Sequence, residues 1–111
     1  MKIIVIGCGK VGKTMIRSLV NEGHDVTAID MDAEVIRMMV NTFDVNGVVG
    51  SGTESSILKE AKVGSAELVI AATASDELNM LSCFLAKRMG RNIPFAASAT
   101  WKITTTALTF W

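Results

Sequence analysis

The chain has 111 residues, enough for one small domain, since a chain of this size buries roughly 60 to 70% of its unfolded surface without disulfides or metals. Eleven basic and eleven acidic residues cancel, and no block of like charge supplies the positive surface of a nucleic-acid binder, so nucleic acid is excluded as a partner. Half of the residues are hydrophobic, but the longest apolar stretch, residues 68–72, is far shorter than the ~20 residues of a membrane-spanning helix.

The N-terminal segment and the cysteines indicate the compartment. Residues 1–7 lack the longer apolar region and the cleavage site of a secretory signal, so we expect a cytoplasmic protein. Cys8 and Cys83 are too few and too far apart for a disulfide framework or a zinc site. We therefore expect two structural thiols in a reduced compartment, and no metal.

The first elements in chain order follow a βαβ rhythm. An apolar run predicts a strand over residues 2–6, a helical period predicts a helix over 10–22, and a second apolar run predicts a strand over 25–29. Gly23 is placed to end the helix. One apolar face of this helix should pack on the sheet; its members are Val11, Met15, Ile16, Leu19 and Val20.

The same alternation continues to about residue 90. It predicts helices near residues 32–43, 53–61 and 75–90 and strands near 44–49 and 67–72. Ser75 should cap the last helix, with Asp76 and Glu77 in its first turn. Because the strands are apolar without polar alternation, both faces of the sheet should be covered by helices. The sequence predicts an α/β fold with a doubly wound parallel sheet, Rossmann-like and shortened at its C-terminus.

A glycine motif lies between the first strand and the first helix. Gly7, Gly9 and Gly12 occupy the three glycine positions of GxGxxG, and this strand-to-helix context makes the motif a strong indication of a site for an adenine dinucleotide or a related adenosine phosphate. Gly7 permits the tight turn, Gly9 lets the backbone approach a pyrophosphate, and Gly12 lets helix and strand pack closely. The amides at the N-terminus of the helix would then point at the phosphates.

A carboxylate at the end of the second strand completes the motif. Asp30 follows Gly12 by 18 residues, where its side chain can accept hydrogen bonds from ribose hydroxyls. Met31 and Asp32 follow with no arginine beside them, so a 2′-phosphate would meet negative charge and NADP is disfavoured. The alternative is that the glycines only serve turns and that Asp30 caps a helix.

Three further segments belong at the same edge of the sheet. Lys10 could reach a phosphate as a flexible positive charge or could be a solvated lysine. The loop Gly50-Ser51-Gly52-Thr53 could contact adenine or ribose, or could be a simple turn with Thr53 as N-cap. The segment Ala71-Ala72-Thr73-Ala74 ends the fourth strand with small side chains, which leave room for a ligand or serve a tight turn.

Residues 1–94 resemble the N-terminal nucleotide-binding domain of the Trk/Ktr family, the cytoplasmic regulators of bacterial potassium uptake, also called TrkA-N, KTN or RCK domains. The resemblance rests on four segments, namely MKIIVIGCGKVG at 1–12, LVNEGHDV at 19–26, GSGTE at 50–54 and SDELNM at 75–80. It implies a regulatory subunit that binds NAD(H), ATP or ADP. It also implies that the domain forms homodimers or larger homo-oligomers and assembles on a membrane potassium-transporter pore subunit at the inner face of the membrane.

The resemblance also assigns the site residues. Phosphates would meet Gly7, Gly9, Lys10 and Gly12, and the adenosine ribose would meet Asp30. The full cofactor-binding set expected from motif and resemblance is Gly7, Cys8, Gly9, Lys10, Val11, Gly12, Asp30, Met31, Gly50, Ser51, Gly52, Thr53, Ala72 and Thr73. NAD(H) is the first choice of ligand, and ATP or ADP is the second.

The C-terminal segment departs from the family pattern. We divide the chain into a nucleotide-binding domain at residues 1–98 and an atypical tail at 99–111, which holds both tryptophans and leaves open a truncated, rearranged or frame-shifted terminus. Its β-branched and aromatic residues favour a strand, paired either with another chain or with the edge of its own sheet. The alternative is a frayed, disordered terminus.

Catalysis is not expected. The sequence has no tyrosine for a Tyr–Lys pair, and its single histidine, His24, lies in a predicted turn. The alternatives are a fragment of an NAD-dependent oxidoreductase and a nucleotide-binding fragment with no surviving regulatory output.

Overall fold

The computed structural model describes residues 1–90 with their side chains, and residues 101–103 and 108–110 as backbone. Four parallel strands lie in the order β3-β2-β1-β4, with the bounds β1 Lys2–Ile6, β2 Asp25–Asp30, β3 Asn46–Val49 and β4 Leu68–Ala71. The intervening helices are α1 (Lys10–Asn21), α2 (Ala33–Thr42), α3 (Ser55–Glu60), the short 3₁₀ helix η1 (Val63–Ser65) and α4 (Asp76–Met89). The predicted doubly wound α/β fold is confirmed.

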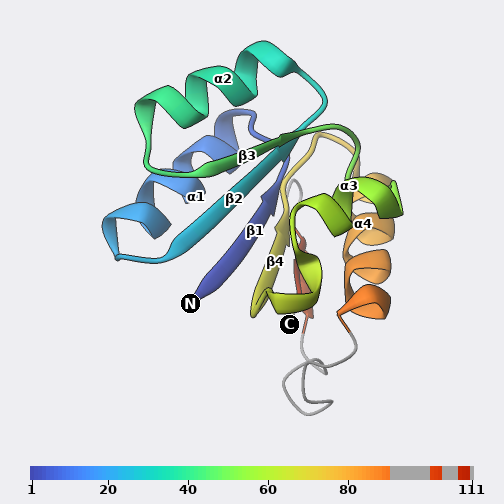
Figure 1. Cartoon of the computed structure of the whole chain (residues 1–111). Helices are drawn as coiled ribbons and strands as arrows, with labels where there is room; N and C mark the ends of the chain where they lie inside the picture. Colours follow the sequence, from blue (N-terminus) through green and yellow to red (C-terminus); the bar gives the residue numbers. More distant parts are fainter. Residues whose placement is uncertain (91–100, 104–107, 111) are drawn as a thin grey trace.

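Helices cover both faces of this sheet. In Figure 1, α1 and α2 lie on one side of the strands, and α3 and α4 lie on the other. The alternate side chains of β1 divide between two separate cores: Ile3 and Val5 pack with α1 and α2, whereas Ile4 and Ile6 pack with α3, η1 and α4. This two-sided burial explains why β1 is apolar throughout.

The ends of the helices follow local chemistry. After α1, Gly23 has a φ of +85°, and the N–H groups of Gly23 and His24 donate to the carbonyls of Val20 and Leu19, which is a Schellman motif. The hydroxyl of Ser75 accepts a hydrogen bond from the Leu78 N–H, so the predicted cap of α4 is confirmed.

Two local predictions were wrong. Thr53 does not cap α3; the N-cap position is Glu54, and the Thr53 hydroxyl instead contacts that of Ser51. Val11 is 37% exposed and does not join the core, because α1 faces the sheet in its first turn through the buried Gly12, on the same helix face as the buried Ile16.

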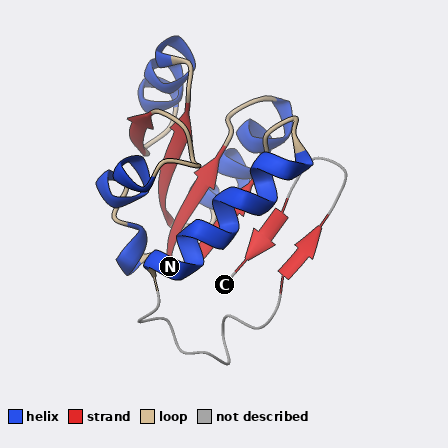
Figure 2. Cartoon of the chain, turned by 90° about the vertical axis from the view of Figure 1, so that its right-hand side faces the viewer, coloured by secondary structure: helices blue, strands red, loops and turns tan. Residues whose placement is uncertain are grey.

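Beyond α4 the backbone returns to the sheet. Strand β6 (Leu108–Phe110) pairs antiparallel with β4, and β5 (Trp101–Ile103) pairs antiparallel with β6, as Figure 2 shows for the two short strands. Of the two partners considered for the tail, the chain's own sheet edge is the one observed. The side chains of this tail lie outside the described residues, and the division at residue 98 stays a prediction.

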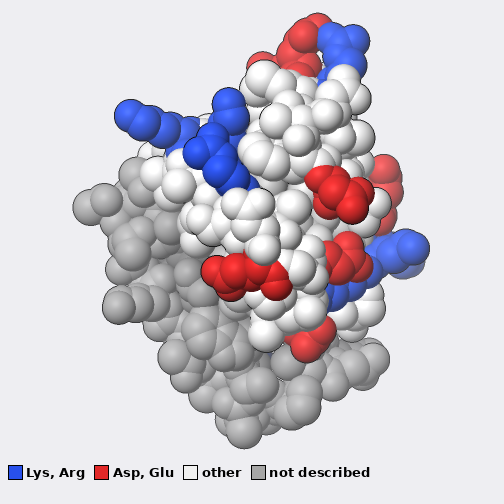
Figure 3. Space-filling model, turned by 90° about the vertical axis from the view of Figure 1, so that its left-hand side faces the viewer, with Lys and Arg blue, Asp and Glu red and all other residues white. Residues whose placement is uncertain are grey.

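Charged side chains of both signs are spread over the surface. On the face shown in Figure 3, groups of basic and acidic residues alternate with uncharged ones instead of forming one patch of a single sign. Within the described residues, no helix has the length and apolarity to cross a bilayer.

Candidate functional site

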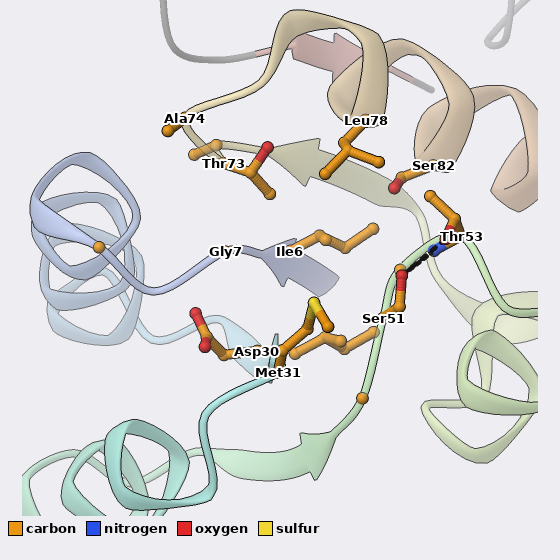
Figure 4. Close-up of a pocket in the computed structure, with 15 residues that line it drawn as sticks. Ile6, Gly7, Asp30, Met31, Ser51, Thr53, Thr73, Ala74, Leu78 and Ser82 are labelled. Atoms are coloured by element: carbon orange, nitrogen blue, oxygen red, sulfur yellow. Dashed lines mark hydrogen bonds between the residues drawn. The ribbon is translucent and has the colours of Figure 1, made fainter.

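A cavity of about 310 Å³ opens at the carboxyl ends of the parallel strands (Figure 4). This is the edge of a doubly wound sheet at which ligands bind, because the strand-to-helix loops diverge there. Its lining comprises Ile6, Gly7, Gly9, Ile29, Asp30, Met31, Gly50, Ser51, Gly52, Thr53, Ala72, Thr73, Ala74, Leu78 and Ser82.

The three glycines of the motif lie in different surroundings, so the fold does not require all of them for the same reason. A Cβ on Gly12 would lie 1.8 Å from the carbonyl oxygen of Gly7, and a Cβ on Gly7, whose φ is +96°, would lie 2.9 Å from the backbone of Thr73. At Gly9, by contrast, a Cβ would meet no atom within 4 Å. Gly7 and Gly12 are thus required by the packing of the fold, whereas Gly9 borders open space in the cavity.

The N-terminus of α1 lies beside Gly9. Gly9 occupies the N-cap position in extended conformation and offers no side chain to the first turn. The first-turn amides of a helix have no carbonyl partner within the helix, and they carry the positive end of its dipole. An anion placed over Gly9 would therefore meet these amides. Lys10 is exposed and is not among the residues that line the cavity.

Asp30 connects two loops through its carboxylate. Oδ2 accepts a hydrogen bond of 2.8 Å from the Cys8 N–H, and Oδ1 accepts one of 2.9 Å from the Asp32 N–H. A carboxylate has about four lone-pair positions, so both oxygens can still accept from a ligand hydroxyl. The alternative role of Asp30 as a helix cap was wrong, because Asp32 is the residue that caps α2.

Asn79 holds the loop after β4. Its Oδ1 accepts from the Thr73 N–H at 2.9 Å and lies 2.6 Å from the Thr73 hydroxyl, and its Nδ2 donates to the Thr73 carbonyl at 3.2 Å. Asn79 is 1% exposed. The sequence analysis named Asn79 only as part of the segment 75–80 and did not assign it this role. The position of Asn79 in the first turns of α4, six residues after Thr73, was the available signal that its amide could bind the loop after β4.

The loop after β3 is held by hydroxyl contacts. Ser51 Oγ and Thr53 Oγ1 lie 2.6 Å apart, and Ser51 Oγ also accepts from the Thr53 N–H at 3.1 Å. Both side chains border the cavity (Figure 4). Between them, Gly52 is buried, and a Cβ there would lie 2.5 Å from Ile6 Cγ2.

Both cysteines are buried free thiols. Burial, together with the charge of Asp30, raises the pKa of Cys8 to about 12, and burial raises the pKa of Cys83 to about 12. Neither thiol is ionised near neutral pH, as expected of structural cysteines. The described part of the chain holds no group of metal-ligating side chains.

Most residues of the predicted site meet at this cavity. Gly7, Gly9, Asp30, Met31, Ala72, Thr73 and the whole segment 50–53 line it, whereas Cys8, Lys10, Val11 and Gly12 do not. The lining residues absent from the expected cofactor-binding set are Ile6, Ile29, Ala74, Leu78 and Ser82, of which Ala74 belongs to the segment of small residues noted at the end of the fourth strand. Leu78 and Ser82 are four residues apart in α4, so helical spacing was the signal that could have placed them on one face.

Comparison with known proteins identifies the family. Residues 3–108 match the TrkA-N domain. The chain belongs to the TrkA-N family. Two curated relatives are named Trk system potassium uptake protein TrkA: the one from Halomonas elongata is 37% identical over 91 residues, covering 82% of this chain and 20% of the relative. The one from Haemophilus influenzae is 39% identical over 83 residues, covering 75% of this chain and 18% of the relative. The chain thus spans about a fifth of the length of these relatives.

Solved structures with this fold come from several functional classes. The TrkA-N domain of the inner membrane protein ybaL from Escherichia coli matches with a TM-score of 0.76 at 16% identity, covering 83% of this chain and 67% of that one. The GsuK channel bound to NAD matches with a TM-score of 0.67 at 22% identity, covering 78% and 16%. ChuY, an anaerobilin reductase from Escherichia coli O157:H7, matches with a TM-score of 0.66 at 15% identity, covering 81% and 47%. These likenesses show the fold.

Proposed function

We propose that this TrkA-N domain is a non-enzymatic regulatory module of a bacterial potassium-uptake system and that it binds an adenine nucleotide in the cavity. NAD(H) is the first candidate ligand, and ATP or ADP is the second. The observation that carries the proposal is the open space at Gly9, beside the Asp30 carboxylate and the N-terminus of α1. Packing does not require glycine there, but the approach of a pyrophosphate does.

The residues of the cavity fit such a ligand. Phosphates would lie against the backbone of Gly9 and the first-turn amides of α1, where the helix dipole favours negative charge. The ribose hydroxyls would donate to Asp30, and the base would lie between the apolar side chains of Ile6, Ile29 and Leu78. Lys10 lies outside the lining, but its flexible side chain would bring a positive charge close to the phosphates.

The proposed output is regulation of a transporter. The relatives named Trk system potassium uptake protein TrkA support a role in potassium uptake. The proposed partner is a membrane pore subunit, with this domain in a homo-oligomer at the cytoplasmic face. A nucleotide can regulate such an assembly only if it binds one conformation more tightly than another. The four loops around the cavity lead into α1, α2, α3 and α4, so a ligand that contacts all of them would favour one arrangement of these helices.

Calorimetric titration with NAD, NADH, ATP, ADP and NADPH tests the ligand assignment. We expect binding of at least one adenine nucleotide, weak or absent binding of NADPH, and loss of binding in Gly9→Ala. The matched control is Gly64→Ala, because a Cβ at Gly64 also meets nothing within 4 Å but lies in η1, away from the cavity. If Gly9→Ala and Gly64→Ala bind every nucleotide like the wild-type chain, the site is wrongly assigned.

An oxidoreductase is the second candidate, since ChuY shares the fold. His24 immediately precedes β2, at the end of the sheet opposite the cavity, and lies 3.6 Å from Glu22. It is therefore not placed to transfer a proton beside a bound nicotinamide. Incubation with NADH and a panel of aldehydes and ketones should give no loss of absorbance above background, and an enzyme-proportional loss would favour the oxidoreductase.

A further inference from the structure

The hydroxyl of Ser82 lies at the end of the cavity formed by α4 and the loop after β3. Ser82 is 1% exposed, yet it lines the cavity, and a Cβ on Gly52 would lie 3.0 Å from its Oγ. Figure 4 shows this hydroxyl between Leu78 and Thr53, with its oxygen toward the cavity, while Asp30 lies on the opposite side. Ser82 and Asp30 thus mark two polar ends of one pocket.

Among the described residues, the Ser82 hydroxyl has no hydrogen-bond partner. A serine or threonine inside a helix can donate to the carbonyl four residues earlier, as Thr14 does to Lys10 at 2.9 Å. Ser82 does not make this bond. No polar side-chain atom in the described part of the chain is fully enclosed without a partner, so the Ser82 hydroxyl keeps its access to the cavity. A buried hydroxyl in this position is poorly solvated and is stabilised by a partner that enters the cavity.

The surroundings of Ser82 define the chemistry of that partner. The adjoining walls are the apolar side chains of Ile6 and Leu78, together with the backbone of Gly52, and Ile29 lines the same cavity. Largely apolar walls with a few hydroxyls, here those of Ser82 and Thr53, suit a flat heteroaromatic ring, which packs by its faces and forms hydrogen bonds by its edge. A hydroxyl can donate to a ring nitrogen or accept from an exocyclic amine. The described lining of the cavity holds no lysine or arginine that would balance the charge of a phosphate at this end.

We propose that Ser82 is the residue that recognises the base of the bound nucleotide, through a hydrogen bond from or to the edge of the adenine ring. This inference rests on the proposed nucleotide binding and adds the polar contact at the base. It gives the pocket a direction, with phosphates at Gly9, ribose at Asp30 and the base edge at Ser82.

Two variants separate the hydroxyl from the shape of the side chain. Ser82→Ala removes the hydroxyl, and Ser82→Cys keeps a side chain of similar shape with only a weak hydrogen-bonding group. Both should weaken binding of ADP, ATP and NAD by about five- to tenfold, the factor that corresponds to one neutral hydrogen bond. Ser18→Ala, an exposed position in α1, is the matched control and should bind like the wild-type chain.

Adenosine without phosphate shows which part of the ligand Ser82 contacts. In a titration followed by NMR, the affinity of Ser82→Ala for adenosine should fall by the same factor as its affinity for ADP. A loss for ADP without a loss for adenosine would place the hydroxyl at a phosphate and overturn the proposal. Equal affinities of wild-type and Ser82→Ala chains for ADP would overturn it as well.

Thermal unfolding of the ligand-free chains gives a readout that needs no nucleotide. Because the Ser82 hydroxyl has no described partner, Ser82→Ala should unfold at the wild-type temperature or above it. A lower unfolding temperature would show that the hydroxyl supports the protein itself and would contradict the proposal. If the wild-type chain binds none of the nucleotides, the proposed function fails. If it binds them and Ser82→Ala binds equally well, only the role of Ser82 fails.

Discussion

The Asp30 carboxylate accepts a hydrogen bond of 2.8 Å from the backbone N–H of Cys8, which ties the end of β2 to the glycine loop after β1. The residue expected to hold the ribose therefore also holds the loop expected to meet the phosphates. Because Asp30 has both roles, a variant at this position changes the pocket as well as the ligand contact.

Asp30→Ala should abolish nucleotide binding and also destabilise the chain. Two charge-assisted hydrogen bonds to backbone amides are lost, and we expect a decrease of roughly 1.5 to 3 kcal/mol in the free energy of unfolding. Asp30→Asn keeps one acceptor and should lose less stability, while still weakening ribose binding. Urea unfolding and calorimetry on the same preparations measure both effects. Unchanged nucleotide affinity in Asp30→Ala would contradict the assignment of this residue.

Gly12→Ala should impair folding, whereas Gly9→Ala should not. A Cβ at position 12 would clash with the carbonyl of Gly7, a backbone atom that cannot rotate away, so we expect a loss of roughly 3 kcal/mol or more. Gly9→Ala enters open space and should change the free energy of unfolding by less than about 1 kcal/mol, because only the N-cap preference and chain entropy change. Urea denaturation of both variants checks this difference. Similar stabilities would show that the loop adapts more than its packing indicates.

Asn79→Ala should loosen the loop after β4. Its bonds to the backbone of Thr73 are buried, and their removal leaves an N–H and a carbonyl without these partners, so we expect a loss of roughly 2 to 3 kcal/mol. Faster amide hydrogen exchange at Thr73, with unchanged exchange in β2, would locate the effect. Asn79→Asp keeps the oxygen that accepts from the Thr73 N–H and serves as the comparison.

The two buried thiols should make the chain less stable in alkali. Their pKa values of about 12 lie above the ordinary value of 9.0, so above pH 9 the unfolded chain releases protons that the folded chain retains. Stability from this source is complete below pH 9 and is lost as the pH rises toward 12. The sequence has no tyrosine, which removes one competing titration. Urea midpoints from pH 8 to pH 10.5 should fall more steeply for the wild-type chain than for a Cys8→Ala, Cys83→Ala double variant; parallel curves would contradict the burial of the thiols.

The sequence predicted the fold well because apolar strands and amphipathic helices alternate without interruption through residue 90. Gly7, Gly9 and Asp30 could be assigned because their spacing reflects one strand–turn–helix geometry. Local competition between hydrogen bonds could not be predicted in this way: the Ser51 and Thr53 hydroxyls contact each other, so α3 begins at Ser55 instead of Thr53.

The sequence also did not predict that α4 forms one wall of the cavity. Leu78 and Ser82 reach the pocket because of how α4 packs against β4, a tertiary relationship that no local motif encodes. Their spacing of four residues shows a shared helix face, but it does not show whether that face meets core, ligand or solvent.

The different surroundings of the three glycines bear on how such a domain would change over evolutionary time. A descendant that no longer used its ligand would still be selected for glycine at positions 7 and 12, because any side chain there collides with backbone. Position 9 would be free to drift, since an alanine there meets nothing. Within a lineage of this fold, glycine at position 9 rather than the complete motif would therefore distinguish members still under selection to bind a nucleotide from those that keep only the architecture.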